Sequence, residues 1–267
     1  MSTTTPSPIG SGGAAEAYDS LASAYDLLTA GYCHDLWLAK IERLAKAHGL
    51  RGTRVLDIAC GTGKSFLPLA ARGYEITACD VSRRMVEIAR AKAPEVVITV
   101  EDMRGLPTMG CFDLVTCLDD AVNYLLSEEE LADFFDGVAR NLDDHGVAVF
   151  DVNSLRVYRE DFQTAWMVDD PGTFIAWTPD PPTETAHGAR MAATVHVFAA
   201  AGDVWLRNSS RHEQRHWDIE DLRDSAEAAS LRVVAVFGQH RGARLEPVFD
   251  ELTHTKALYI VTHGRRW

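Results

Sequence analysis

Hydrophobic and polar positions predict alternating helices and strands over roughly the first half of the chain. Residues 14–29 and 34–48 carry apolar side chains at helical spacing, with Leu21, Tyr25 and Leu28 on one side of the first segment. Short apolar runs of strand length follow, separated by helical segments, at residues 54–59, 75–80, 96–100, 112–118 and 146–152. This alternation predicts a parallel sheet covered on both faces, with ligands bound outside the carboxyl ends of its strands.

Two of the predicted helices begin with capping residues. Ser82 precedes the helical segment RRMVEIARAKA, which ends before Pro94. Ser127 and Glu130 have the spacing of a capping box at the start of SEEELADFFDGVARNL. These signals place one helix after the second strand and another after the fourth.

The pattern changes near residue 155. Two long extended segments on either side of Gly202 and Asp203 predict an antiparallel hairpin. Helical spacing returns after Asp218, the expected N-cap, and the segments RVVAVFG and ALYIVTH predict two closing strands. We therefore expect a hairpin region inserted between the parallel strands and the strands that complete the sheet.

Length and charge narrow the classes of function. With 267 residues, 46% of them hydrophobic, the chain is long enough for one large α/β domain with an elaborated cap. Its formal net charge is −13 and its basic runs are short, which disfavours nucleic acid as a partner. No apolar run approaches the roughly 18 residues of a membrane span, so we expect no membrane partner.

Cysteine usage and the first residues indicate a cytoplasmic protein. The five cysteines form no CxxC pair and lie in apolar surroundings, as reduced, buried thiols do. The start, MSTTTPSPIGSGG, lacks the charged and apolar regions of a signal peptide. We expect a disordered tail over residues 1–13.

The stretch ACGTGKSF, residues 59–66, has the G-K-[ST] ending of a phosphate-binding P-loop. A P-loop also needs a glycine five positions before Gly63, where this chain has Ile58. A dinucleotide fingerprint would need a third glycine at Phe66, which is too large for close contact between helix and strand. The P-loop cannot be built as written, and the dinucleotide interpretation is weakened without being excluded. Lys64 is then expected to face solvent.

Acidic residues at the strand ends favour a different ligand. Asp57 lies in the first strand, where it would repel a pyrophosphate but suit a cationic or hydroxyl-bearing ligand. Asp80 ends the second strand, where a carboxylate can accept both ribose hydroxyls. Asp102 can accept from an adenine amine, with Met103 against the ring. Together they describe an adenosine without phosphates and with a positively charged tail.

Three segments, VLDIACGTG, ACDVSRRM and EDM, resemble in order and spacing the cofactor motifs of class I S-adenosylmethionine (SAM)-dependent methyltransferases. The match covers roughly residues 15–154. The segments TCLDDAVNYL, FDVNS and RHEQRHW resemble the small-molecule branch of that family, which includes bacterial amino-sugar N-methyltransferases and related natural-product enzymes.

The resemblance implies a Rossmann-like α/β fold: a seven-stranded, mostly parallel sheet with helices on both faces and an added antiparallel hairpin region. It divides the chain into a SAM-binding core with an N-terminal helical lid (14–154), a substrate-capping insertion (155–217) and a C-terminal completion of the sheet (218–267). The cofactor contacts expected on these grounds are Tyr25, Trp37, Asp57, Ala59, Gly61, Thr62, Gly63, Asp80, Val81, Asp102, Met103 and Leu118.

Two metal-binding patterns are disfavoured, and we expect no metal. HEQRH, residues 212–216, has the H-E-x-x-H spacing of zinc proteases, but that spacing brings both histidines together only on a helix. In a strand, four residues span roughly 13 Å. Carboxylates that hold Mg²⁺ in catechol-type O-methyltransferases have approximate counterparts in Asp119, Asp120, Asp151 and Asn153, although the FDVNS spacing matches the metal-free branch.

Asp119 is the most informative departure from the family pattern, which tends to have a large apolar or aromatic residue there. A carboxylate at this position can anchor an ammonium or take a proton from the acceptor as it is methylated. This favours an amine nitrogen, or a nucleophilic carbon of an electron-rich heteroaromatic such as an indole. Tyr25, Tyr124 and His216 are secondary candidates for positioning or proton relay.

Other interpretations remain at this point. Asp119 can instead cap the next segment or contact the cofactor. The acceptor can be a hydroxyl or carboxyl oxygen, and a non-catalytic SAM-binding protein is a less favoured hypothesis. Modification of nucleic acid lacks the [DN]PP[YFW] motif, since this chain has LDDA there. We expect a monomer or a homodimer acting on a small molecule.

Overall fold

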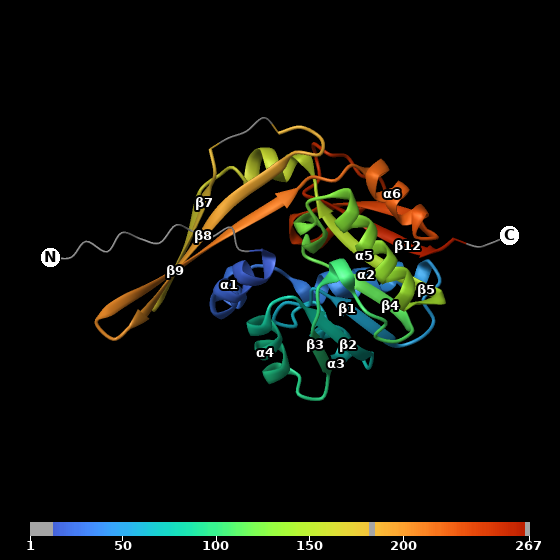
Figure 1. Ribbon diagram of the computed structural model, residues 1–267, viewed down its shortest axis with the longest axis horizontal. Coiled ribbons are helices and arrows are strands. Elements are labelled where there is room, and N and C mark those ends of the chain that lie inside the picture. Colours follow the sequence, from blue (N-terminus) through green and yellow to red (C-terminus); the bar gives the residue numbers. More distant parts are fainter. Residues whose placement is uncertain (1–12, 182–184, 265–267) are drawn as a thin grey trace.

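The computed structural model describes residues 13–181 and 185–264. The expected tail lies outside these residues except for Gly13. Figure 1 shows a main sheet with helices on both sides and a second sheet that extends away from it. No helix in the described ranges is long and apolar enough to cross a membrane.

The main sheet has the strand order β11-β10-β12-β5-β4-β1-β2-β3. Its neighbouring parallel strands are β1 (Arg54–Ile58), β2 (Glu75–Asp80), β3 (Val97–Val100), β4 (Phe112–Cys117) and β5 (Leu142–Asn153). The antiparallel strands at the other end are β12 (Lys256–His263), β10 (Leu231–His240) and β11 (Arg244–Glu246). The mostly parallel α/β fold is thus confirmed.

The sheet has eight strands where the sequence predicts seven. The additional strand is β11, which has three residues and follows the single turn η4 (Arg241–Ala243). Three residues are too few for an alternating pattern to be recognised in the sequence.

Helices cover both faces of the main sheet. They are α1 (Ala14–Leu28), α2 (His34–Ala47), α3 (Leu67–Ala71), α4 (Arg83–Lys92), α5 (Glu128–Asn141) and α6 (Ile219–Ala228). Short helical turns are η1 (Met103–Gly105), η2 (Ala121–Tyr124) and η3 (Val157–Asp161). The predicted caps at Ser82 and Ser127 are confirmed, because Ser82 accepts from Met85 and the Ser127–Glu130 capping box is formed. Asp218 occupies the N-cap position of α6 as predicted, but its side chain makes no cap bond.

Alternate residues of β5 divide the core into two layers. Val147 and Val149 belong to the same hydrophobic cluster as Leu38 of α2, whereas Phe150 packs with Phe134 of α5. Successive side chains in a strand point to opposite faces, so a run that is apolar at every position indicates burial on both sides. This explains why β5 has no alternation in its sequence.

The second sheet contains four antiparallel strands: β6 (Trp166–Asp170), β7 (Thr173–Pro179), β8 (Arg190–Ala201) and β9 (Val204–Arg215). The predicted hairpin corresponds to β8 and β9, which turn at Gly202 with a φ of 64°. Helix α1 packs against this sheet, since Leu21 clusters with Ile175 and Val195. The predicted lid helix therefore contacts the inserted region directly.

Candidate active site

The turn after β1 brings Gly61 and Gly63 to the carboxyl edge of the sheet, where β1 lies between β2 and β4. Ala59 and Gly61 have positive φ angles of 56° and 53°. A Cβ atom on Gly61 would lie 3.5 Å from Cε1 of Tyr25. The Tyr25 ring of α1 thus lies against the glycine turn, where the sequence predicts a cofactor contact.

Asp57 holds this turn from inside the protein. The side chain is fully buried and accepts hydrogen bonds from Ser65 Oγ at 2.5 Å and Thr116 Oγ1 at 2.6 Å. Burial raises its pKa to about 7. The sequence predicts Asp57 as a ligand contact. In the structure each of its oxygens accepts from a protein hydroxyl, so Asp57 also supports the turn.

Lys64 does not face solvent as the sequence suggests. Its Nζ donates to the carbonyl and hydroxyl of Thr29, at 3.1 and 2.8 Å, and to the carbonyl of Asp26. These acceptors lie at the end of α1, where helix carbonyls need partners. The hydroxyl of Thr62 also donates to Asp26, at 2.6 Å. The end of α1 is therefore fastened to the glycine turn.

Asp80 lies beside the same turn at the end of β2. Its two oxygens accept from the backbone N–H groups of Gly61 and Ser82, each at 2.8 Å. Burial raises its pKa to about 6. Asp102 caps η1 and forms a two-pronged ion pair with Arg104. The predicted ribose and adenine contacts therefore follow neighbouring parallel strands, as an adenosine site requires.

Asp119 and Asp120 follow β4 with φ angles of 60° and 55°, a conformation that costs free energy for residues other than glycine. Lys256, the first residue of β12, lies among the carboxylates there. Its Nζ is 2.9 Å from Asp120 and 2.8 Å from Asp151. Burial alone would lower the pKa of Lys256, but the surrounding carboxylates raise it well above its usual range. Such an ammonium stays charged.

His34, the first residue of α2, lies beside Asp119. The distance from His34 Nε2 to Asp119 Oδ2 is 2.8 Å. Burial opposes ionisation of Asp119, but His34 and Lys256 lower its pKa below the ordinary value. An ionised carboxylate can only accept, so the bond requires a proton on His34 Nε2.

Three buried polar atoms in the described part of this region have no hydrogen-bond partner: His34 Nδ1, Trp37 Nε1 and Asp151 Oδ1. The Trp37 ring lies 6.3 Å from the His34 ring and 5.8 Å from Lys256 Nζ. Buried polar atoms are normally paired, because an unpaired one costs free energy. Trp37 Nε1 is therefore a donor, and Asp151 Oδ1 an acceptor, that no described protein group pairs. The lone pair of His34 Nδ1 is a second unpaired acceptor.

The position of Lys256 argues against a magnesium ion among these carboxylates. Its ammonium already lies within 4 Å of Asp119, Asp120 and Asp151, and the Asn153 amide donates to Gln214. A cation of the protein thus occupies the place among these carboxylates that a magnesium ion would need.

Tyr124 meets His212 rather than His216. The Tyr124 hydroxyl lies 2.9 Å from His212 Nδ1, and burial lowers the pKa of His212 to about 4. His216 instead lies 3.3 Å from Glu251 and packs against Tyr158. The two histidines of HEQRH thus have different neighbours, as the strand geometry predicts.

Sequence reasoning missed His34 and Lys256 as parts of this region, and no local motif marks them. His212 belongs to the HEQRH segment, in which His216 rather than His212 is the predicted candidate. Lys256 arrives through the antiparallel register of β12 on β5, where it pairs with Asn153. His34 arrives because α2 begins beside the end of β4. The remaining predicted contacts Gly63, Val81, Met103 and Leu118 lie in the turns after β1, β2, β3 and β4.

Known proteins resemble this chain over most of its length. A family model described as a methyltransferase domain matches residues 55–146. A protein of Geobacillus sp. (strain WCH70), named as a methyltransferase, is 30% identical over 225 residues, covering 82% of this chain and 90% of its own. The dTDP-3-amino-3,6-dideoxy-alpha-D-glucopyranose N,N-dimethyltransferase of Streptomyces fradiae is 27% identical, covering 73% of this chain and 76% of its own.

A solved structure supports the same fold. The crystal structure of a SAM-dependent methyltransferase from Clostridium acetobutylicum superimposes with a TM-score of 0.78 at 24% identity, covering 93% of this chain and 99% of the other. The 30% identity to the Geobacillus relative over most of both chains shows the family, and the likeness to the solved structure shows the fold. The chain belongs to the SAM-dependent methyltransferase family.

Proposed function

We propose that this protein transfers the methyl group of SAM to an amine nitrogen of a small-molecule acceptor. The observation that carries the proposal is the pairing of His34 with Asp119 at 2.8 Å, next to a buried group of carboxylates. The S. fradiae relative, whose name gives an amino sugar as its acceptor, supports an amine.

The residues at the strand ends fit the cofactor. Asp80 would accept from the ribose, and Asp102 and Met103 would lie at the adenine. Trp37 Nε1, buried and without a partner, is a donor that suits the carboxylate of the methionine end. When bound, SAM supplies an electrophilic methyl group.

His34 is proposed as the proton acceptor. Because Nε2 donates to Asp119, the other ring nitrogen, Nδ1, keeps a lone pair, and it has no partner in the described structure. An ammonium acceptor must lose one proton before its nitrogen lone pair can attack the methyl carbon, whereas a neutral amine forms an N-methylammonium that loses its proton after transfer. In either case the bond between the methyl carbon and sulfur would break and S-adenosylhomocysteine would leave. A positioned base contributes typically 10²–10⁴-fold to such a step.

Asp119 is then a positioning residue for His34. Its lowered pKa makes it a weak base, whereas its negative charge stabilises the imidazolium that forms when His34 accepts a proton. The free Oδ1 of Asp151 can accept from an ammonium acceptor before transfer. A neutral hydroxyl would gain less from this negative surrounding.

A carbon acceptor on an indole is the second candidate. Aromatic rings lie close together beside the site: Tyr18 is 5.2 Å from Tyr124 and 6.2 Å from Tyr25 between ring centroids. Such rings can hold a flat aromatic acceptor. The same His34 would then take the ring proton that is lost after methylation.

The test is an acceptor screen with methyl-labelled SAM. Purified protein is incubated with amino sugars, peptides with a free N-terminus, indoles and phenols, and the product is located by mass spectrometry. We expect label on nitrogen. Label on oxygen alone would reject the proposed acceptor class, and SAM binding without transfer to any acceptor would favour a non-catalytic protein.

A further inference from the structure

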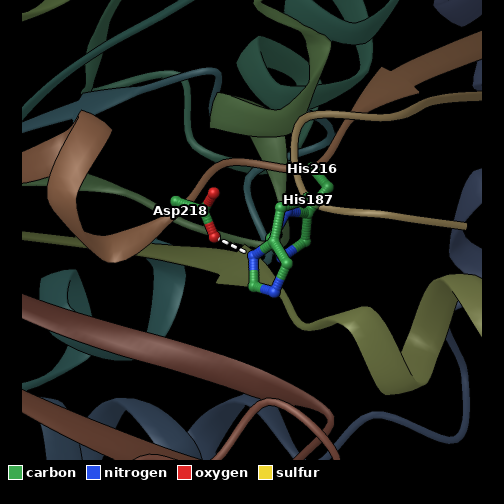
Figure 2. A group of neighbouring side chains, drawn as sticks. All are labelled: His187, His216 and Asp218. Atoms are coloured by element: carbon green, nitrogen blue, oxygen red, sulfur yellow. Dashed lines mark hydrogen bonds and ion pairs between the residues drawn. The ribbon is translucent and has the colours of Figure 1, made fainter.

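Three side chains outside the candidate active site converge at the start of α6. They are His187, from the segment before β8; His216, directly after β9; and Asp218, at the N-cap of α6 (Figure 2). One ligand atom from each lies within 4.8 Å of the other two. Two imidazoles and a carboxylate are a donor set that binds borderline divalent metals.

His216 is fully buried, and both of its ring nitrogens make only long hydrogen bonds. Its Nε2 lies 3.3 Å from Glu251 Oε2, and its Nδ1 lies 3.4 Å from the N–H of Gly188. Well-formed bonds from nitrogen are 2.7–3.2 Å long. Both ring nitrogens are therefore held loosely in an environment where polar atoms are normally well paired.

The charges around the cluster favour a cation. Asp218 makes no side-chain cap to its own helix, and its carboxylate turns instead to His187 Nδ1 (Figure 2). Within the described residues, neither Asp218 nor Glu251 forms an ion pair with a lysine or arginine. Two carboxylates therefore lie near two imidazoles without a permanent positive charge paired to them.

A second cluster, made by His240, Glu246 and His254, provides a contrast. There Arg244 lies 3.3 Å from Glu246, and His254 Nδ1 accepts from the N–H of Asp250 at 3.0 Å. This cluster contains its own cation and has a histidine nitrogen that is already well paired. The cluster at α6 differs in having no lysine or arginine paired with its carboxylates in the described residues.

We propose that His187, His216 and Asp218 bind a divalent transition-metal ion such as Zn²⁺. Glu251 lies next to His216, where a carboxylate can orient a metal-binding imidazole or complete the coordination. The ion fastens the segment before β8 to the start of α6, and so holds the second sheet to the main one. It is separate from the proposed methyl transfer and does not depend on it.

This site differs from the H-E-x-x-H pattern in the sequence. His216 belongs to both, but its metal-binding partners come from residues 187 and 218, while His212 contacts Tyr124. The sequence predicts no metal, and the proposed ion departs from that prediction. The prediction did not consider histidines brought together by the second sheet.

The test is metal binding by the full chain, purified without a histidine tag and treated with a chelator. Zn²⁺ is added in competition with a chromophoric chelator, and Co²⁺ absorption reports the coordination. We expect one high-affinity ion per chain, with affinity at least tenfold weaker in His187→Ala and in Asp218→Asn. Both residues are partly exposed, so these variants should fold.

Controls assign the ion to its site. The exposed His145→Ala should bind Zn²⁺ as the unaltered chain does. Zn²⁺ should raise the melting temperature of the unaltered chain and of His145→Ala but not that of His187→Ala. Absence of stoichiometric binding, or binding unchanged in His187→Ala and Asp218→Asn, overturns the proposal. Loss of binding only in His240→Ala would place the ion in the second cluster and overturn it equally.

Discussion

His34 Nε2 lies 2.8 Å from Asp119 Oδ2, which joins the first residue of α2 to a residue 85 positions later, just after β4. The bond sets the imidazole in the form that carries its proton on Nε2. It thereby leaves Nδ1 as the basic atom. The sequence singles out Asp119 as a candidate catalytic residue. In the proposed mechanism Asp119 instead supports His34, a base that the sequence did not indicate.

Asp119→Asn should reduce turnover without weakening the binding of SAM. The amide can donate to Nε2 and so favour the wrong tautomer of His34. We expect kcat to fall by about 100-fold or more while the dissociation constant for SAM changes by less than about threefold. Calorimetry and initial rates measure the two quantities.

The matched control is Asp144→Asn, an exposed carboxylate outside the site. It should leave both quantities unchanged. Turnover retained in Asp119→Asn would remove the carboxylate from the mechanism.

Lys256→Met should destabilise the protein in a pH-dependent manner. The change leaves the buried carboxylates of Asp120 and Asp151 without their counter-charge, which costs about 3–5 kcal/mol for a broken buried pair. Burial already raises the pKa of Asp151 to about 6, so protonation at lower pH relieves the repulsion. Urea unfolding should show a difference from the unaltered chain that is larger at pH 8 than at pH 5. A difference that is independent of pH would contradict this electrostatic origin.

Asp57 should make stability fall as pH rises. Its folded pKa is about 7, whereas an unfolded aspartate has a pKa of about 3.9. Between these values the folded state holds a proton that the unfolded state has lost, so folding is favoured most at the acidic end. The contribution is about 1.4 kcal/mol per unit of pKa difference.

Asp57→Asn should therefore flatten the pH dependence of unfolding between pH 4 and 7 in the absence of ligand. The Asn side chain can still accept from one of the two hydroxyls, Ser65 or Thr116. A pH profile parallel to that of the unaltered chain would show that Asp57 is ionised throughout this range.

Asp80 should make SAM binding depend on pH. Burial raises its pKa to about 6, and the ionised form is the better acceptor for ribose hydroxyls. We expect SAM affinity to fall as pH decreases from 7.5 to 5. In Asp80→Asn the affinity should be weaker at pH 7.5 and nearly constant with pH. Equal pH dependence in both proteins would assign the titration to another group.

The core fold was predictable because its signals are local. The capping residues Ser82 and Ser127, the five apolar runs and the turn at Gly202 each act within a few residues. The strands β6 and β7 were not predicted. Their sequences, WMVDD and TFIAWTP, are short and mix apolar with polar residues without regular alternation. The two strands join the second sheet because β7 pairs with β8.

The site was predictable only in part. The sequence places Asp80 at the end of the second strand and Asp119 just after the fourth, and both positions are confirmed, whereas their roles in the site stay predictions. His34 lies in this region because α2 begins there, and Lys256 lies there because of the register of β12 on β5. Such tertiary contacts produce no recognisable motif or residue spacing in the sequence. Asp57 is predicted as a ligand contact, and the sequence gives no sign that hydroxyls from neighbouring residues pair with both of its oxygens.

The most direct measurement of the proposed chemistry is a double-mutant cycle on the turnover of the identified acceptor, using His34→Gln, Asp119→Asn and the two changes together. SAM affinity is measured for each protein, so that binding and turnover are separated. If His34 is the base and Asp119 acts through it, His34→Gln lowers kcat by about 100-fold or more and the second change adds almost nothing. Wild-type turnover in His34→Gln, or losses that multiply in the double variant, would contradict this mechanism.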